Sequence, residues 1–173
     1  MSTNLKKITS ARASDWYGNI WKTVGKCVFC DLNEKYILAE EEEMALVMNK
    51  YPYTDGHLLV VPRVHIASCK ELTESQWQII RKFQYIARKL FKKYLDSKSS
   101  SIWTLIREGG VEAQVTVSDH LHIHLIPFSN PELCKWNFQE EIYEVEDMKN
   151  LLISECEIEK YAKKWEKKYK TTL

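Results

Sequence analysis

The sequence predicts an α+β domain in which an antiparallel sheet of about five strands packs against one main helix, with further helices at the C-terminal end. Three observations support this fold class. Short apolar or alternating runs separated by turn signals are typical of strands. One long amphipathic segment lies between two of these runs and is typical of a helix. The C-terminal part repeats apolar residues at helical spacing.

The composition suits one folded domain in the cell interior. The chain has 173 residues, of which 45% are hydrophobic, enough for a real core. Its formal net charge of +1 gives no electrostatic case for nucleic-acid binding. No apolar run approaches the ~20 residues of a membrane span, and residues 1–14 have no signal-peptide core. We therefore expect a cytoplasmic protein with neither nucleic acid nor membrane as a partner.

The first half of the chain predicts three strands. Residues 1–26 are polar and are expected to form an N-terminal arm. Tyr36–Glu40 and Met44–Asn49 read as strands joined by an acidic turn. A structured loop with Asp55-Gly56 follows, and His57–Pro62 is a short apolar strand that its proline ends.

The middle of the chain predicts the main helix and a fourth strand. Thr73-Glu74-Ser75-Gln76 has the pattern of a capping box, so the helix begins near Thr73 and continues to about Leu95. Its apolar stripe should pack on the sheet; the stripe comprises Trp77, Ile80, Phe83, Ala87, Leu90 and Tyr94. Ile102–Arg107 is the next strand.

The last part predicts one or two amphipathic helices between about residues 140 and 170, whose Glu- and Lys-rich face is solvated. The domain organisation that we expect is therefore an arm (1–26), a compact domain (27–138) and a C-terminal helical extension (139–173).

The stretch from Asp119 to Pro127 contains three of the five histidines, His120, His122 and His124, at alternate positions. The residues between them are all apolar. Strict alternation predicts a half-buried strand that presents three imidazoles on one face, about 6.5–7 Å apart.

Three imidazoles on one face fit either of two kinds of site. A His-x-His strand can present nitrogens to a metal, as in a metal-dependent hydrolase with all three histidines as ligands. A histidine supported by its neighbours can instead act as a nucleophile or general acid near neutral pH. The spacing does not separate the two.

Cys27 and Cys30 form a Cys-x-x-Cys pair, which can be half of a zinc site, a redox pair or neither. Because the chain has no second pair of this kind, a four-cysteine site is excluded, and a metal would have to use histidines as well. The odd total of five cysteines does not suggest a disulfide framework.

Taken together, these motifs resemble the histidine triad family of nucleotide hydrolases and transferases. The run from His120 to Ile126 is similar to the defining pattern of that family. The run from Asn49 to Pro62 is similar to the segment that precedes it in the dinucleoside polyphosphate hydrolases and phosphorylases. The order of the motifs, the helix between them and the early cysteine pair agree as well. The resemblance covers roughly residues 27–128.

The resemblance implies a covalent mechanism. His122 would attack the α-phosphorus of a nucleoside 5′-phosphate derivative, and water or phosphate would release the nucleotide from the histidine. The carbonyl of His120 would fix the tautomer of His122. His57 and His124 resemble residues that contact phosphate oxygens, and His124 would also help to protonate the leaving group. Neither Mg²⁺ nor an organic cofactor is implied.

The resemblance also suggests residues that bind the substrate. Asn49 lies at the position of a ribose contact, and Arg107 and Gln114 lie in the segment that resembles the phosphate-side loop. Two departures stand out. An amide is usual at the position of Arg107, whose side chain either clamps a phosphate or points to solvent. Gln114 lies two residues further than usual from the triad, so Thr116 or Ser118 could take its place.

Some family members bind a structural zinc with ligands that resemble Cys27, Cys30, His65 and His120. The family also implies a homodimer and a purine nucleotide as substrate. Among substrates, dinucleoside polyphosphates come first and nucleoside phosphoramidates second. A catalytically weak nucleotide-binding scaffold is the alternative outside enzyme chemistry.

Overall fold

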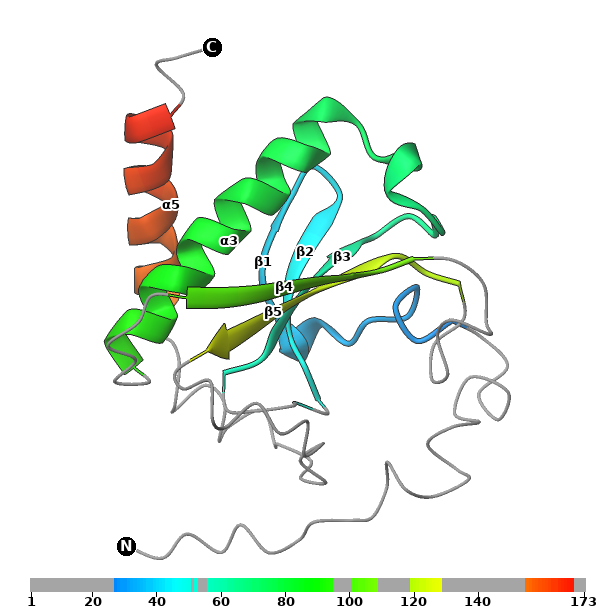
Figure 1. Ribbon diagram of the computed structural model, residues 1–173, viewed down its shortest axis with the longest axis horizontal. Coiled ribbons are helices and arrows are strands. Elements are labelled where there is room, and N and C mark those ends of the chain that lie inside the picture. Colours follow the sequence, from blue (N-terminus) through cyan, green and yellow to red (C-terminus); the bar gives the residue numbers. More distant parts are fainter. Residues whose placement is uncertain are drawn as a thin grey trace, which may run out of the picture.

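The computed structural model describes residues 27–50, 52, 56–94, 101–108, 119–128 and 155–169. Within them, one antiparallel sheet has the strand order β1-β2-β3-β5-β4 (Figure 1). Its strands are β1 (Ile37–Glu41), β2 (Met44–Met48), β3 (Leu58–Pro62), β4 (Ser101–Arg107) and β5 (His122–Phe128). The helical elements are η2 (Glu34–Tyr36), η3 (Cys69–Glu71), α3 (Glu74–Tyr94) and α5 (Glu155–Tyr169). The predicted α+β fold with five antiparallel strands is confirmed.

The histidine strand lies inside the sheet. The chain first forms the meander β1-β2-β3, then crosses through α3 to the edge strand β4, and returns as β5 between β3 and β4. In the register, Leu59 of β3 and Leu105 of β4 both lie opposite His124, and Arg107 lies opposite His122. His124 is therefore paired with a strand on each side, and His122 is paired with β4.

The sheet has an apolar layer on each face. Helix α3 covers one face, where its buried side chains pack with Leu46, Val60 and Ile123 (Figure 1). The opposite face carries a smaller cluster that comprises Phe29, Ala45, Val47, Leu59 and Val61. Because residues paired across neighbouring strands share a face, His122 and His124 lie on this second face, away from α3.

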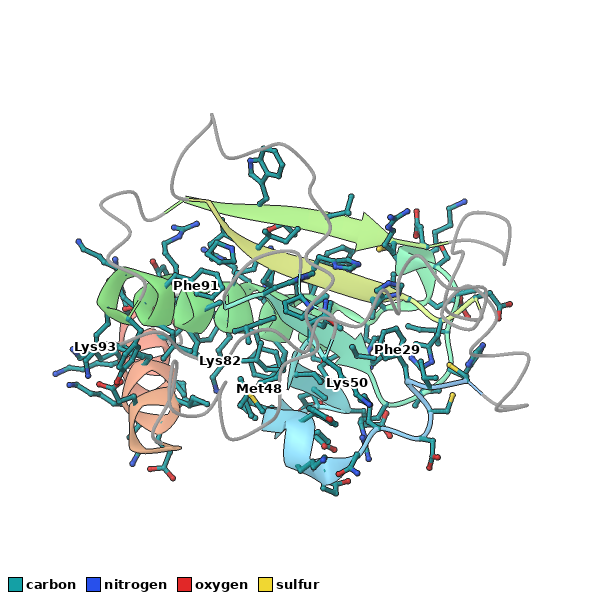
Figure 2. The ribbon with its side chains drawn as sticks, turned by 90° about the horizontal axis from the view of Figure 1, so that it is seen from below. Phe29, Met48, Lys50, Lys82, Phe91 and Lys93 are labelled. Atoms are coloured by element: carbon teal, nitrogen blue, oxygen red, sulfur yellow. The ribbon has the colours of Figure 1, made fainter. Side chains whose placement is uncertain are left out.

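Helix α3 begins where the sequence predicts. The Thr73 hydroxyl accepts the Gln76 N–H at 3.2 Å, and the Gln76 side chain accepts the Thr73 N–H at 3.0 Å, so the capping box is present. The predicted stripe is wrong at Trp77, which is 37% exposed. Lys82 is instead buried (Figure 2), because two carboxylates from distant elements meet its ammonium group.

These carboxylates attach α5 to the rest of the fold. The Lys82 ammonium donates to Glu41 at 2.5 Å and to Glu166 of α5 at 2.7 Å. Near the other end of α5, Glu157 accepts hydrogen bonds from Lys93 and Tyr94. The described part of the C-terminal extension thus packs against α3 and β1. Residues 1–26 and the segment before α5 lie outside the described residues.

No helix in the described part of the chain combines the length and the apolar character that a membrane span requires.

Candidate active site and metal centre

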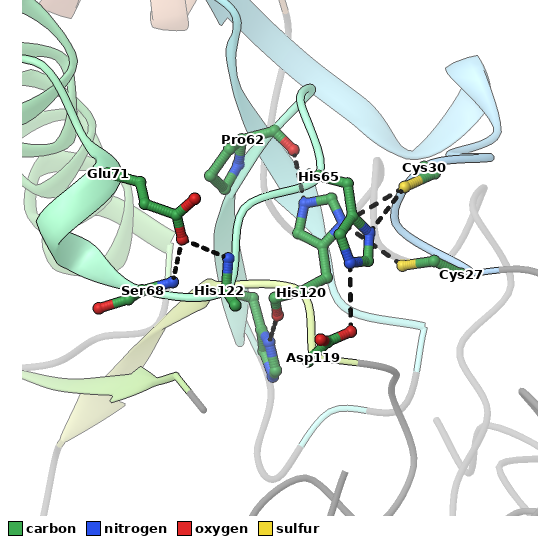
Figure 3. A network of polar contacts seen from close by, with 10 residues as sticks. Cys27, Cys30, Pro62, His65, Ser68, Glu71, Asp119, His120 and His122 are labelled. Carbon is green, nitrogen blue, oxygen red and sulfur yellow. Dashed lines mark hydrogen bonds and ion pairs between the residues drawn. The ribbon is translucent and has the colours of Figure 1, made fainter. Parts of the chain in front are cut away.

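The three histidines of the triad do not form one row. Pairing with β4 begins only at His122, so His120 precedes β5 and the expected strand is two residues too long at this end. The His120 ring turns toward the loop after β3, where its Nε2–H donates to the Pro62 carbonyl at 2.9 Å (Figure 3). The Leu121 N–H donates to the Ile66 carbonyl at 2.7 Å and holds the same loop.

The ring of His120 joins a cluster of possible metal ligands. The ligand atoms of Cys27, Cys30, His65 and His120 all lie within 4.8 Å of one another. Nδ1 of His120 lies 3.3 Å from the Cys27 sulfur and 3.5 Å from the Cys30 sulfur, and Nδ1 of His65 lies 3.1 Å from the Cys30 sulfur (Figure 3). The four residues that the sequence suggested as zinc ligands are therefore together.

The hydrogen bonds of the two imidazoles suit a metal ion. Nε2–H of His120 donates to a carbonyl, and Nε2–H of His65 donates to the Asp119 carboxylate at 3.2 Å. Both Nδ1 lone pairs therefore face the sulfurs. A tetrahedral zinc ion with Zn–N and Zn–S bonds of about 2.0–2.3 Å needs donor atoms roughly 3.3–3.8 Å apart. The nitrogen–sulfur distances of 3.1, 3.3 and 3.5 Å lie close to this range, so two thiolates and two imidazoles fit a closed structural zinc site.

The thiol of Cys30 is protonated before metal binding. Burial, and then the neighbouring Cys27, raise the pKa of Cys30 to about 11. Because zinc binds thiolates, loading of the cluster must release protons, and the affinity for zinc must increase with pH.

In His122 the two ring nitrogens have the reverse of the roles that they have in His65 and His120. Its Nδ1–H donates to the His120 carbonyl at 2.9 Å, so Nε2 carries the lone pair (Figure 3). Burial, aided by the charge of Arg107, lowers the pKa of His122 to about 4, against the effect of that hydrogen bond. The ring of Phe29 packs on the imidazole with centroids 4.8 Å apart. His122 is therefore a buried neutral imidazole with a nucleophilic nitrogen at pH 7.

His57 and His124 form a second pair beside His122, whose ring centroid lies 5.0 Å from that of His124. Nε2 of His57 lies 2.8 Å from Nδ1 of His124. On the other side of His57, the Asn49 amide nitrogen lies 3.1 Å from Nδ1. The same amide nitrogen lies 3.4 Å from Nε2 of His57, so it approaches both nitrogens of that ring. One of the two rings donates the hydrogen atom that joins His57 to His124.

Of the other two residues predicted to contact the phosphates, the structure describes one. Arg107 is half-buried at the end of β4, on the sheet face that carries His122. Gln114 and its alternatives, Thr116 and Ser118, lie outside the described residues. Two contributors were not assigned a role from the sequence, Phe29 and Asp119. Their positions were the only signal: Phe29 lies between the two cysteines, and Asp119 directly precedes the triad.

The fold and this arrangement of histidines define a nucleotide-binding protein of the histidine triad type. Residues 26–138 match the family described as "Scavenger mRNA decapping enzyme C-term binding", which is histidine triad-like, and the chain belongs to this family.

Two relatives with named activities match parts of the chain. The adenosine 5′-monophosphoramidase HINT3 of Danio rerio is 31% identical over 118 residues, which cover 64% of this chain and 69% of that protein. The asymmetrical bis(5′-nucleosyl)-tetraphosphatase of Schizosaccharomyces pombe is 33% identical over 87 residues, or 48% of this chain and 43% of that protein. These relatives support a nucleotide hydrolase at the level of the family.

A solved structure supports the fold. A zinc-bound histidine triad family protein from Mycobacterium smegmatis superposes with a TM-score of 0.58 at 21% sequence identity, over 83% of this chain and 98% of that chain.

Proposed function

We propose that this protein is a nucleotide hydrolase or transferase with His122 as its covalent nucleophile. The observation that carries the proposal is the state of the His122 ring. Its Nδ1–H is held by the His120 carbonyl, its Nε2 has the lone pair, and burial keeps it neutral. Such a ring can attack phosphorus near pH 7 without first losing a proton to a base.

The reaction proceeds in two displacements at the α-phosphorus of a nucleoside 5′-phosphate derivative. In the first, a bond forms between Nε2 of His122 and phosphorus, and the bond to the leaving group breaks. His124 helps to protonate the leaving group, and His57 and His124 contact the phosphate oxygens as negative charge develops. In the second, water or phosphate attacks phosphorus and returns a proton to His124, the N–P bond breaks, and His122 returns to its neutral form.

The substrate is a purine dinucleoside polyphosphate. The similarity of residues 49–62 to the enzymes that act on such compounds supports this choice, as does the tetraphosphatase relative. Asn49 contacts the ribose, and Arg107 and Gln114 contact the phosphates. A nucleoside phosphoramidate is the second candidate, because a relative that is 31% identical is named a phosphoramidase. The two candidates share the nucleophile and differ in the leaving group.

Cys27, Cys30, His65 and His120 hold a structural zinc ion in this proposal. A closed set of four protein ligands leaves no position for substrate, so zinc cross-links the chain and takes no part in the chemistry. It joins the loop at Cys27 and the loop after β3 to the residue whose carbonyl holds His122. In this proposal the catalytic domain comprises residues 27–138, with 1–26 as an arm and 139–173 as a helical extension, and the protein is a homodimer.

The test is mass spectrometry of protein that is quenched with acid-free denaturant during turnover of diadenosine tetraphosphate or of adenosine 5′-phosphoramidate. We expect one added adenylyl group, which peptide mapping assigns to His122 and which His122→Ala lacks. The substrate with the higher kcat/KM identifies the preferred leaving group. Turnover that His122→Ala leaves unchanged would contradict the covalent mechanism.

A further inference from the structure

The carboxylate of Glu108 joins the end of β4 to the start of η3. Glu108 directly follows Arg107, the last residue of β4. One of its oxygens, Oε2, accepts the Cys69 N–H at 2.7 Å and the Ser68 hydroxyl at 3.1 Å. Burial, and then the charge of Glu108, raise the pKa of the Cys69 thiol to about 11, so the thiol lies beside the same carboxylate. Two consecutive residues from a distant part of the chain therefore contact this one side chain.

The segment that Glu108 contacts is itself held by hydrogen bonds. Ser68 caps η3, and the Glu71 carboxylate accepts the Ser68 N–H at 2.9 Å (Figure 3). Two residues before Ser68, the Ile66 carbonyl accepts the Leu121 N–H at 2.7 Å, directly before β5 begins. The loop after β3 thus holds the start of β5 through Ile66 and the end of β4 through Glu108.

The end of β4 lies next to the proposed nucleophile. In the described part of the chain β4 is an edge strand that pairs with β5, and the last pair of this ladder joins Arg107 to His122. Pairs at the end of an edge strand open more readily than pairs inside a sheet. The charge of Arg107 acts on His122, whose pKa it helps to lower, so a displaced strand end would move a cation away from the nucleophile. Because the Arg107 residue also has interactions of its own, Glu108 fixes the position of its backbone and not the direction of its guanidinium group.

We propose that Glu108 is a positioning residue that fastens the end of β4 to the loop after β3 and so keeps Arg107 opposite His122. The attachment follows from the hydrogen bonds of Glu108 alone. Its effect on turnover rests on the proposed function, in which Arg107 contacts the phosphates of the substrate. Glu108 then acts on the reaction through Arg107.

Two variants of Glu108 separate the attachment from the charge. Glu108→Ala removes the acceptor of both hydrogen bonds. Glu108→Gln removes the charge but keeps an oxygen, and one oxygen is enough because both hydrogen bonds go to Oε2. Glu159→Ala is the matched control, since it removes an exposed carboxylate on α5 whose printed ion pair is with Lys163.

The direct measurement is hydrogen exchange of the substrate-free protein, followed by mass spectrometry of overlapping peptides from β4. In Glu108→Ala the amides at the Arg107 end of β4 should exchange about 10-fold faster, because two hydrogen bonds to a charged group are lost. The amides of β2 should be unaffected, and Glu108→Gln and Glu159→Ala should exchange like the wild type. Unchanged exchange at this end of β4 in Glu108→Ala would overturn the proposal. So would equally faster exchange throughout the sheet, which would indicate a loss of global stability.

A double-mutant cycle with Arg107→Gln tests the effect on turnover. If Glu108 acts through Arg107, Glu108→Ala should lower kcat/KM for diadenosine tetraphosphate about 10-fold in the wild type but less than about 2-fold in Arg107→Gln. Glu108→Gln should restore most of the loss. Equal losses in both backgrounds, or no loss in either, would overturn the effect on turnover. A missing adenylyl group on His122 in the wild type would contradict the proposed function, while hydrogen exchange would still decide whether Glu108 fastens β4.

Discussion

Two groups of histidines share one region of the molecule and present opposite nitrogens. In the metal group, His65 and His120 donate Nε2–H to oxygen acceptors and direct Nδ1 at sulfur. In the catalytic group, His122 donates Nδ1–H to an oxygen acceptor and keeps its lone pair on Nε2. The groups also differ in their partners, since His57 and His124 bond to each other rather than to cysteines.

The oxygen atom that accepts one ring N–H determines which of the two ring nitrogens keeps its lone pair. The direction of that lone pair suits the histidine either to bind a metal or to attack a substrate. His120 belongs to both groups, because its ring faces the cysteines and its carbonyl holds His122. The two groups are therefore chemically separate but mechanically connected through one residue. Variants that affect one group and not the other test this separation.

The largest effect is expected for His122→Ala. Removal of a covalent nucleophile should lower kcat by at least about 10⁴-fold, because no neighbouring group can replace the attacking nitrogen. The zinc content should remain at one ion per chain, since no ligand is lost. Steady-state kinetics and metal analysis of the same sample provide both values. If the variant also lost its zinc, the two groups would not be separate.

Removal of a metal ligand should lower the zinc content and the stability and leave the nucleophile in place. Cys30→Ala should lose the zinc ion, and with it about 4 kcal/mol of stability when free zinc exceeds Kd about 1,000-fold. For a chain of this size the loss corresponds to roughly 10 °C in Tm. Thermal unfolding with and without zinc measures it, and Cys69→Ala, which changes a cysteine outside the ligand set, is the control. A Tm of wild-type protein that does not respond to zinc would contradict the metal centre.

The pH dependence of stability tests the burial of His122. Its pKa is about 4 in the folded protein and 6.5 in an exposed chain, so below pH 6.5 the unfolded state binds a proton that the folded state does not. Stability is therefore complete above pH 6.5 and decreases as the pH falls toward 4, by roughly 3 kcal/mol. Urea unfolding at several pH values should show this decrease in the wild type and a smaller one in His122→Gln. Equal slopes would mean that His122 is not buried as a neutral ring.

The sequence predicted the individual strands and helices better than it predicted which of them lie side by side. Alternating and helical patterns are local, so the five strands and the main helix follow from them. The position of β5 between β3 and β4 has no local signal, because it depends on which edge remains after the first three strands have paired. Lys82 also gives no local signal: it reads as a surface residue until Glu41 and Glu166 come together around it.

Prediction of the site was limited in the same way, because contacts between distant segments have no local signal in the sequence. Alternation placed His120 in one row with His122 and His124, but a strand exists only where a partner strand pairs with it, and β4 ends opposite His122. The four predicted metal ligands do lie together in the structure, and the family resemblance had suggested this contact between distant segments. The bond between Asn49 and His57 required the loop geometry, since a spacing of eight residues does not determine whether two side chains meet.

The smallest expected effect concerns Asp119, which orients a ligand without being one. Its carboxylate accepts Nε2–H of the exposed His65, and so keeps the Nδ1 lone pair directed at the Cys30 sulfur. Loss of such a partner usually weakens metal binding 10- to 100-fold. Chelator competition should therefore give a Kd for zinc that is about 10-fold higher or more in Asp119→Ala. The increase should be smaller in Asp119→Asn, which keeps an oxygen acceptor.

Glu159→Gln provides the control for charge, because Glu159 is an exposed carboxylate on α5 that pairs only with Lys163 among the described interactions. Its affinity for zinc should equal that of the wild type. If Asp119→Ala bound zinc as tightly as this control, the tautomer of His65 would not depend on its oxygen partner. The rule drawn from the comparison, that the proton acceptor decides the role of each histidine, would then hold only for the buried rings, where no water can replace the missing acceptor.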